Sequence, residues 1–411
     1  MKSDLDALML AHDVDVLLVN GPAYSNPAMM YLTGGGHITH AELIKKRGEQ
    51  AVLFCGPMER EEAAKTGLPT RLYSEYPIAD RMKAANGDAG LADALRLKQQ
   101  LIDVGVTRGR VAIYGVVEAG PLFGNLTQVA KMLPELEFTG FVYDPIFDGA
   151  MLTKEPAEIE RIRKVGKITT EVVGRVADYL TGQRVKDEVL VNPDGQPVTV
   201  ADVKSRIDLW LAELGASNPE ATIFAIGRDA GIPHSAGTPT DLLRLGQSIV
   251  FDIFPCEAGG GYFYDFTRTW SLGYATDEVL SLYEQVNSVY KDLAAGLIPG
   301  QPFIEVQRRT NDLFEAMGHN TIRKQSDATE GYIHSIGHGV GLKVHEMPFS
   351  GLAAGPEDKL VPGSVFTLEP GLYYPSRNMG VRIEDTYATR ADGRFEVLVD
   401  YPYDLVLPVK E

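Results

Sequence analysis

Two stretches far apart in the chain, LGQSIVFDIF at residues 245–254 and PGSVFTLEPG at residues 362–371, share one pattern. Each is a run of apolar and β-branched residues that ends in an acid, with a glycine six positions before that acid. Short apolar runs bounded by glycine and proline are typical of buried strands. The two acids are Asp252 and Glu369. The repetition predicts that the C-terminal part of the chain contains two related α/β units.

Each of these strands leads into a second strand-like segment that carries an acid of its own. GYFYDFTRTW at 261–270 follows turn glycines and contains Asp265, and MGVRIEDTYA at 379–388 contains Glu384. Side chains alternate between the two faces of a strand, so Glu384 shares a face with Arg382 while their apolar neighbours point the other way. We therefore expect each unit to be a hairpin with one acid on each strand.

Acids on buried strands need a partner. Removing a carboxylate from water is costly, and the group normally becomes protonated or acquires a compensating charge. Taken singly, Asp252 could be a turn or cap residue, and Glu384 could form a surface ion pair worth roughly 0–1 kcal/mol. Taken together, acids that converge on one point would repel one another. Two divalent ions with a histidine ligand would remove that repulsion.

A histidine-rich segment supplies a candidate for that ligand. HSIGHGVGLKVHE at 334–346 contains three of the chain's eight histidines, which are His334, His338 and His345. Such a segment is either a decorated surface loop or one wall of an active site. Because acids and histidines follow one another in the order Asp, Asp, His, Glu, Glu, we favour the active-site wall.

The composition is that of an ordinary globular protein with an excess of acids. Of the 411 residues, 44% are hydrophobic and 23% charged, and 39 basic against 56 acidic residues give a net charge of −17. This length predicts two or three domains. The acidic balance argues against a nucleic-acid partner, which needs a basic face. No stretch approaches the ~18 uncharged apolar residues of a membrane span. With two cysteines and no signal-like N-terminus, we expect a cytoplasmic protein.

Residues 1–150 alternate strand-like and helical segments, which predicts a small α/β domain. A helical pattern lies around 91–105. The strand-like segments are 14–20, 50–56, 110–116 and 138–144.

The pattern changes near residue 150. One long amphipathic helix is expected at 152–180, with Thr153 as its cap and Pro156 in its first turn. We place the domain boundary at 148–155, so that the second domain comprises residues 151–411.

The quoted segments resemble those of the pita-bread metallopeptidases, which include aminopeptidase P, prolidase and methionine aminopeptidase, together with their metal-free relative creatinase. NPAMMYLTG at 26–34 resembles the N-terminal domain that aminopeptidase P, prolidase and creatinase share. IPHSAG at 232–237 is similar to the segment that supplies a histidine on the substrate side, here His234. The two-aspartate hairpin, the histidine segment and both glutamate segments extend the resemblance over nearly the whole chain.

The resemblance implies an α/β fold, with a small creatinase-like N-terminal domain and a pita-bread catalytic domain built on a pseudo-twofold repeat. It implies a site for two divalent ions. Oxygen ligands with one imidazole suit Mn²⁺ best, and Zn²⁺, Co²⁺ and Fe²⁺ remain compatible. The implied metal ligands are Asp252, Asp265, His338, Glu369 and Glu384.

The resemblance also implies roles in catalysis. Glu369 would carry a proton from the attacking water to the leaving nitrogen. His345 and His234 would stabilise the tetrahedral intermediate. His334 would hold the far side of the substrate, and Arg382 would orient the carboxylate ligands.

The implied activity is hydrolysis of peptide bonds that precede proline, by an Xaa-Pro dipeptidase or aminopeptidase acting on short peptides with proline second. A homodimer is expected. The alternatives are a creatinase-like amidinohydrolase and a catalytically silent binding or chaperone module, and the five retained ligand positions argue against both.

The sequence departs from the family at three points. Asp252 and Asp265 are 13 residues apart, more than is usual, and Phe254 and Ser335 stand where glycine is common.

Overall fold

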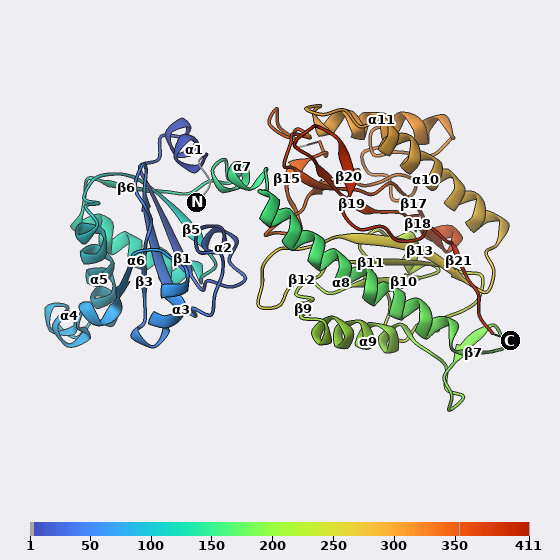
Figure 1. Ribbon diagram of the computed structural model, residues 1–411, viewed down its shortest axis with the longest axis horizontal. Helices are drawn as coiled ribbons and strands as arrows, with labels where there is room; N and C mark the ends of the chain where they lie inside the picture. Colours follow the sequence, from blue (N-terminus) through green and yellow to red (C-terminus); the bar gives the residue numbers. More distant parts are fainter. Residues whose placement is uncertain (1–3, 353, 411) are drawn as a thin grey trace. The chain divides into compact units, whose positions relative to one another are not determined.

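A computed structural model describes residues 4–352 and 354–410, which form two compact units. The N-terminal unit extends to Met151 and also includes Gly259–Gly261. The C-terminal unit comprises Leu152–Ala258 and the chain from Tyr262 onward. Figure 1 shows the elements of both, coloured along the sequence. That the N-terminal unit folds independently of the other stays a prediction.

The N-terminal unit is built on one six-stranded sheet in the order β4-β3-β2-β1-β5-β6. Its strands are β1 Val16–Gly21, β2 Ala41–Lys46, β3 Val52–Cys55, β4 Thr70–Leu72, β5 Gly109–Gly115 and β6 Leu136–Thr139. Its helices are α1 Leu5–Ala11, α2 Pro27–Thr33, α3 Arg60–Lys65, α4 Ile78–Ala84, α5 Ala89–Asp103, α6 Ala119–Met132 and α7 Phe147–Met151. Apolar residues of α5 and α6 pack with those of β1, β2 and β3 in one core.

Three of the four predicted strands of this unit are found as β1, β3 and β5. The fourth prediction, 138–144, was placed too far along the chain, because β6 comprises Leu136–Thr139. Strand β2 was not predicted, since its sequence AELIKK carries charges at buried positions. The structure accommodates them in pairs: Glu42 accepts a hydrogen bond from Arg96, and Lys45 donates one to Asp6.

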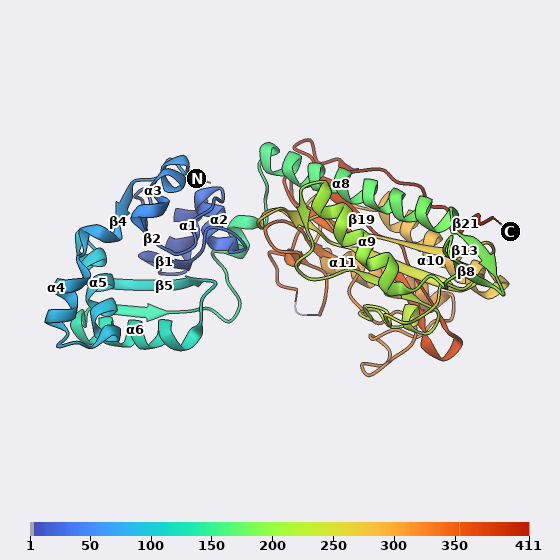
Figure 2. The same cartoon turned by 90° about the horizontal axis from the view of Figure 1, so that it is seen from below.

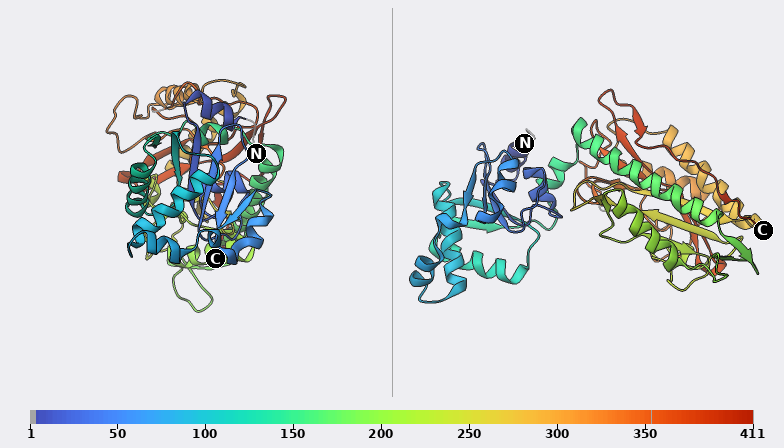
Figure 3. Two further views of the ribbon diagram at one scale, coloured as in Figure 1. Left: turned by 90° about the vertical axis from the view of Figure 1, so that its left-hand side faces the viewer. Right: turned by 60° about the horizontal axis from the view of Figure 1, so that its bottom comes forward.

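The C-terminal unit places its strands between two pairs of helices. These are α8 Pro156–Thr181 with α9 Val200–Glu213, and α10 Asp277–Ala295 with α11 Phe303–Ala316. Figures 1 and 2 show α8 and α9 on one side of the strands and α10 with α11 on the other, and the right-hand view of Figure 3 agrees. One pair of helices therefore lies on each side of the strands.

Two main sheets lie between these helices. One has the order β10-β11-β13-β21, and the other β15-β14-β16-β19-β20. Their strands are β10 Ile223–Ile226, β11 Ser248–Ile253, β13 Phe266–Leu272, β14 His338–Gly339, β15 Glu346–Phe349, β16 Val365–Leu368, β19 Asp385–Thr389, β20 Phe395–Val397 and β21 Val406–Leu407. Smaller pairs are β7 Arg184–Lys186 with β8 Val189–Val191, β9 Ala216–Ser217 with β12 Cys256–Glu257, and β17 Gly371–Tyr374 with β18 Met379–Arg382.

The predicted repeat is present, but its second half is more elaborate than a hairpin. β11 pairs antiparallel with β13, and β16 pairs antiparallel with β19. In the second case the chain first forms the separate hairpin β17–β18. An isolated bridge between Thr267 and Glu384 then joins the two sheets.

The long helix begins later than expected. Thr153 is not its cap, because α8 starts at Pro156 after Glu155. The side chain of Glu158 accepts a hydrogen bond from the backbone N–H of Glu155, which satisfies a group that the helix leaves unpaired. Among the described residues, no helix is both long and apolar enough to cross a membrane.

Candidate metal centre

The predicted acids lie where the two sheets meet. Asp252 is near the end of β11, Asp265 directly precedes β13, and Glu369 directly follows β16. Glu384 lies at the bridge to Thr267, between β18 and β19. The ends of strands from both sheets therefore bring four distant acids to one region.

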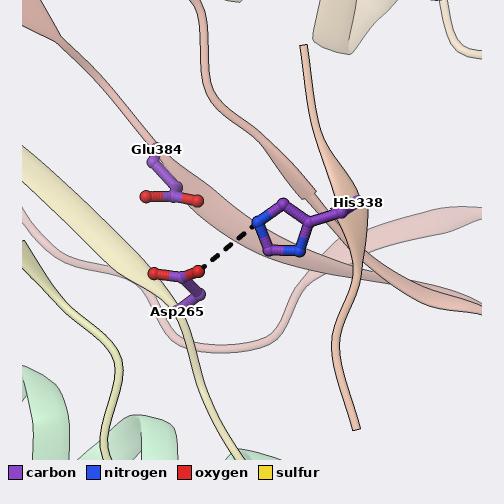
Figure 4. Close-up of side chains that lie close together, drawn as sticks. All are labelled: Asp265, His338 and Glu384. Atoms are coloured by element: carbon purple, nitrogen blue, oxygen red, sulfur yellow. Dashed lines mark ion pairs between the residues drawn. The ribbon is translucent and has the colours of Figure 1, made fainter. Parts of the chain in front are cut away.

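His338 completes this cluster. The ligand atoms of Asp265, His338 and Glu384 all lie within 4.8 Å of one another. Figure 4 shows these side chains pointing toward one another from three separate segments. The Nε2 atom of His338 is 3.6 Å from Oδ2 of Asp265 and 3.5 Å from Oε1 of Glu369.

The tautomer of His338 leaves Nε2 free to act as a ligand. Its Nδ1 lies 3.1 Å from the carbonyl oxygen of Gly339, which can only accept a hydrogen bond. Nδ1 therefore carries the proton, and the lone pair of Nε2 faces the acids, an arrangement common for metal-bound histidines. Burial, with the nearby His345, lowers the pKa of His338 to about 3, so the ring is neutral.

The protein compensates the carboxylates only in part. Burial, followed by mutual repulsion, raises the pKa values of Asp265 and Glu384 well above the ordinary range. Burial also raises the pKa of Glu369 to about 8. Among the described residues, Oδ1 of Asp252 and Oδ1 of Asp265 are buried without a hydrogen-bond partner. Orphaned oxygens beside a neutral imidazole are the donor set expected for divalent ions.

Arg382 is the buried cation nearest to these acids. Its NH2 group donates to Oδ2 of Asp252 at 2.6 Å, and its Nε donates to Oγ1 of Thr267 at 3.2 Å. Thr267 in turn donates to Oε2 of Glu384 at 2.6 Å. Arg382 thus fixes one carboxylate directly and another through a threonine, which is the geometry needed for the predicted orienting role.

The other histidines lie around the cluster in different ways. Both ring nitrogens of His334 have partners: Nδ1 donates to the carbonyl of Ser335 at 2.7 Å, and Nε2 accepts from the Tyr373 hydroxyl at 3.1 Å. Binding substrate through His334 would require exchanging one of these bonds. The ring of His345 contacts that of His338, with centroids 4.2 Å apart. His234 is exposed.

A cavity of about 390 Å³ joins every predicted site residue. Its lining includes Phe254 and Ser335, the two departures from the family pattern. The sequence did not single out Tyr373, which links Arg382 to His334, or Glu220 at the cavity. The contact of Thr267 with Glu384 depends on the meeting of the two sheets.

Comparison with known proteins agrees with this site. The model of metallopeptidase family M24 matches residues 160–391. The Xaa-Pro dipeptidase of Pyrococcus furiosus is 28% identical over 395 residues, covering 95% of this chain and 93% of that protein. The probable dipeptidase PepE of Mycobacterium tuberculosis is 31% identical over 256 residues, covering 62% of this chain. That match spans only 60% of the PepE length.

Solved structures show the same fold. The Xaa-Pro dipeptidase of Bacillus anthracis superposes with a TM-score of 0.74 at 20% identity, covering 98% of both chains. The prolidase of Pyrococcus horikoshii gives a TM-score of 0.72 at 22% identity, again with 98% of both chains. The predicted pita-bread architecture is thereby confirmed. With its acid and histidine cluster inside the matched region, the chain belongs to metallopeptidase family M24.

Proposed function

We propose that the protein hydrolyses peptide bonds that precede proline, in dipeptides or at the N-terminus of longer peptides, with two divalent metal ions. The observation that carries the proposal is the buried cluster of incompletely compensated carboxylates with His338 inside a cavity. The names of the relatives, Xaa-Pro dipeptidase and prolidase, support the choice of bond.

Asp252, Asp265, His338, Glu369 and Glu384 would hold the ions. Carboxylate oxygens with one imidazole suit Mn²⁺, although Zn²⁺, Co²⁺ and Fe²⁺ accept the same ligands. Bound ions of this kind acidify a water molecule and polarise a carbonyl group. We also propose that the protein forms a homodimer and acts in the cytoplasm.

Glu369 moves the proton. Its carboxylate lies 3.5 Å from Nε2 of His338, beside the proposed ions, where it can accept a proton from an attacking water and release it again. Thr367 donates to Oε1 of Glu369 at 3.3 Å and helps to fix its direction. Glu369 would take the proton from the attacking water and give it to the leaving nitrogen.

His345 and His234 would donate hydrogen bonds to the oxygen that gains negative charge in the transition state. They line the same cavity but are outside the proposed ligand set. The bonds from Arg382 to Tyr373 and from Tyr373 to His334 hold the opposite wall in place.

The leaving nitrogen of a bond before proline is special because it carries no N–H group. It must be protonated as the bond breaks, and Glu369 meets that need. A substrate panel tests the proposal: purified protein with Mn²⁺, Co²⁺ or Zn²⁺ should cleave Ala-Pro or Ala-Pro-Ala much faster than Ala-Ala. Cleavage of Ala-Ala with neither proline peptide cleaved would refute the proline assignment.

A further inference from the structure

One acid of the cavity stands outside the metal cluster. Glu220 lines the same cavity as the proposed ligands but is exposed, whereas the cluster is buried. Among residues 4–352 and 354–410, its carboxylate has no ion-pair or hydrogen-bond partner. An exposed, unpaired carboxylate in this place faces whatever enters the cavity.

The turn that presents Glu220 is fixed by its neighbours. The Nδ2 of Asn218 donates to Oγ1 of Thr222 at 3.0 Å and to Oδ1 of Asp208 at 2.9 Å. Ala221, next to Glu220, has a φ of 64°, a left-handed conformation that costs energy for a residue with a Cβ. Thr222 is buried. The hydrogen bonds of Asn218 and the left-handed conformation of Ala221 thus fix the turn that holds Glu220 at the cavity.

Glu220 lies on the side of the cavity where His345 is found. Burial lowers the pKa of His345, and the largest opposing effect comes from the charge of Glu220. The neighbouring lining residues Val344, Phe349 and Phe254 are apolar and offer a substrate side chain no charge. A cationic group that enters beside His345 can therefore approach the carboxylate of Glu220 past these apolar residues.

Among the described residues of the cavity wall, no basic side chain pairs with Glu220. The only lysine or arginine among the described residues that line the cavity is Arg382. Its guanidinium is buried and already bonded to Asp252, Thr267 and Tyr373. The charge of Glu220 remains available to the substrate.

We propose that Glu220 makes the enzyme select peptides whose first residue has a cationic side chain, lysine or arginine. This inference rests on the proposed function. The α-ammonium group is separated from the scissile carbonyl by a single carbon, so it stays with the buried acids at the metal centre. A long cationic side chain can extend from there to an exposed carboxylate at the cavity wall.

The test compares first residues of equal length and different charge. We would measure kcat/KM for Lys-Pro-Ala, norleucine-Pro-Ala and Glu-Pro-Ala, and for the corresponding dipeptides, with the wild type, Glu220→Gln and Glu220→Lys. The wild type should prefer lysine over norleucine by about two- to fivefold at low salt, the range expected for an exposed ion pair. Added salt should shrink the preference.

Glu220→Gln should abolish most of the lysine preference, and Glu220→Lys should shift it to glutamate. Glu284 on α10, an exposed acid that does not line the cavity, provides the matched control. Glu284→Gln should keep the wild-type ratio. Equal kcat/KM for lysine and norleucine in the wild type would overturn the inference while leaving Xaa-Pro hydrolysis in place. Lysine preference on Xaa-Ala peptides, with no Xaa-Pro cleavage, would support charge selection and overturn only the proline assignment.

Discussion

Two buried clusters of charge lie on opposite faces of the same strands. Thr267 and Glu384 face the metal centre, while the next residues along the chain, Arg268 and Asp385, face away from it. Arg268 donates to Oδ1 of Asp385 at 2.9 Å, and Tyr290 and Tyr403 donate to Oδ2 of the same acid at 2.5 and 2.7 Å. That cluster is complete without any ligand.

The opposite face has acids with raised pKa values and orphaned oxygens instead. The same strands thus carry one charge cluster that stabilises the fold and another that requires a bound cation to balance its charge. Burial of charge alone does not identify a functional site. Incomplete compensation of buried charge points to a functional site, because unpaired buried charges contribute nothing to the stability of the fold.

The largest expected effect concerns the complete cluster. Asp385→Asn leaves the buried guanidinium of Arg268 without its counter-charge, which typically costs about 3–5 kcal/mol of unfolding free energy. The loss should be similar in metal-free and metal-loaded protein, as measured by denaturant unfolding. A loss that appears only in the loaded protein would make this cluster part of the metal site.

The next effect separates the histidines of the other face. His345→Ala should keep its metal and near-normal KM but lose kcat by roughly 10²–10³, or about 2.7–4 kcal/mol of transition-state stabilisation. His338→Ala should lose metal as well. Elemental analysis of the metal content, together with steady-state kinetics, distinguishes the proposed roles of the two histidines. If His345→Ala also empties the site, the proposed division of roles is wrong.

The two clusters should respond to the same substitution with opposite changes in the free energy of unfolding. The pKa of Asp265 is raised well above its value in the unfolded chain, so the metal-free fold must take up a proton there that the unfolded chain has released. Asp265→Asn removes that cost, so the metal-free protein should become more stable, by about 1–3 kcal/mol. The matched substitution Asp385→Asn destabilises it. Unfolding of both variants in a chelator gives the two signs, and destabilisation by Asp265→Asn would remove the distinction between the clusters. With metal present, Asp265→Asn should bind less metal and lose activity.

The smallest effect is a dependence on pH. In the metal-free protein, Glu369 has a pKa of about 8, above that of an unfolded glutamate, so the folded state holds a proton that the unfolded state has released. Stability should therefore fall as pH rises from about 6.5 to 8, by up to about 1.4 kcal/mol per unit for each such proton. His334 and His338, with pKa values of about 3, are neutral throughout this range.

Chelated wild type and Glu369→Gln would be unfolded at several pH values. The variant should show a shallower slope, because its side chain cannot titrate. Metal-loaded wild type should behave in the opposite way and bind its ions more tightly as pH rises, since ligand carboxylates must be ionised. A flat profile for chelated wild type would contradict the raised pKa.

The sequence predicted the fold class, and side-chain alternation predicted which residues share a strand face. Alternation along 379–388 placed Arg382 and Glu384 on one face with Val381 and Ile383 on the other, and the structure has the latter pair in the apolar core. Such inferences succeed because they depend only on local geometry.

Features that depend on distant partners were missed. Strand β2 was hidden by charges whose partners, Arg96 and Asp6, lie elsewhere in the chain. The hairpin β17–β18 interrupts what looked like a simple repeat. The link from Arg382 through Tyr373 to His334 requires three segments to meet, and no sequence spacing encodes that meeting.

The bridge between Thr267 and Glu384 has a mechanical consequence. The first sheet and its edge supply Asp252 and Asp265, and the second supplies His338, Glu369 and Glu384. Ions bound as proposed would fasten one sheet to the other at the seam where that isolated backbone bridge lies. Removing the ions should speed amide hydrogen exchange along the facing ends of β13 and β19 more than within α8. The bound ions would then stabilise the packing of the two sheets as well as take part in catalysis.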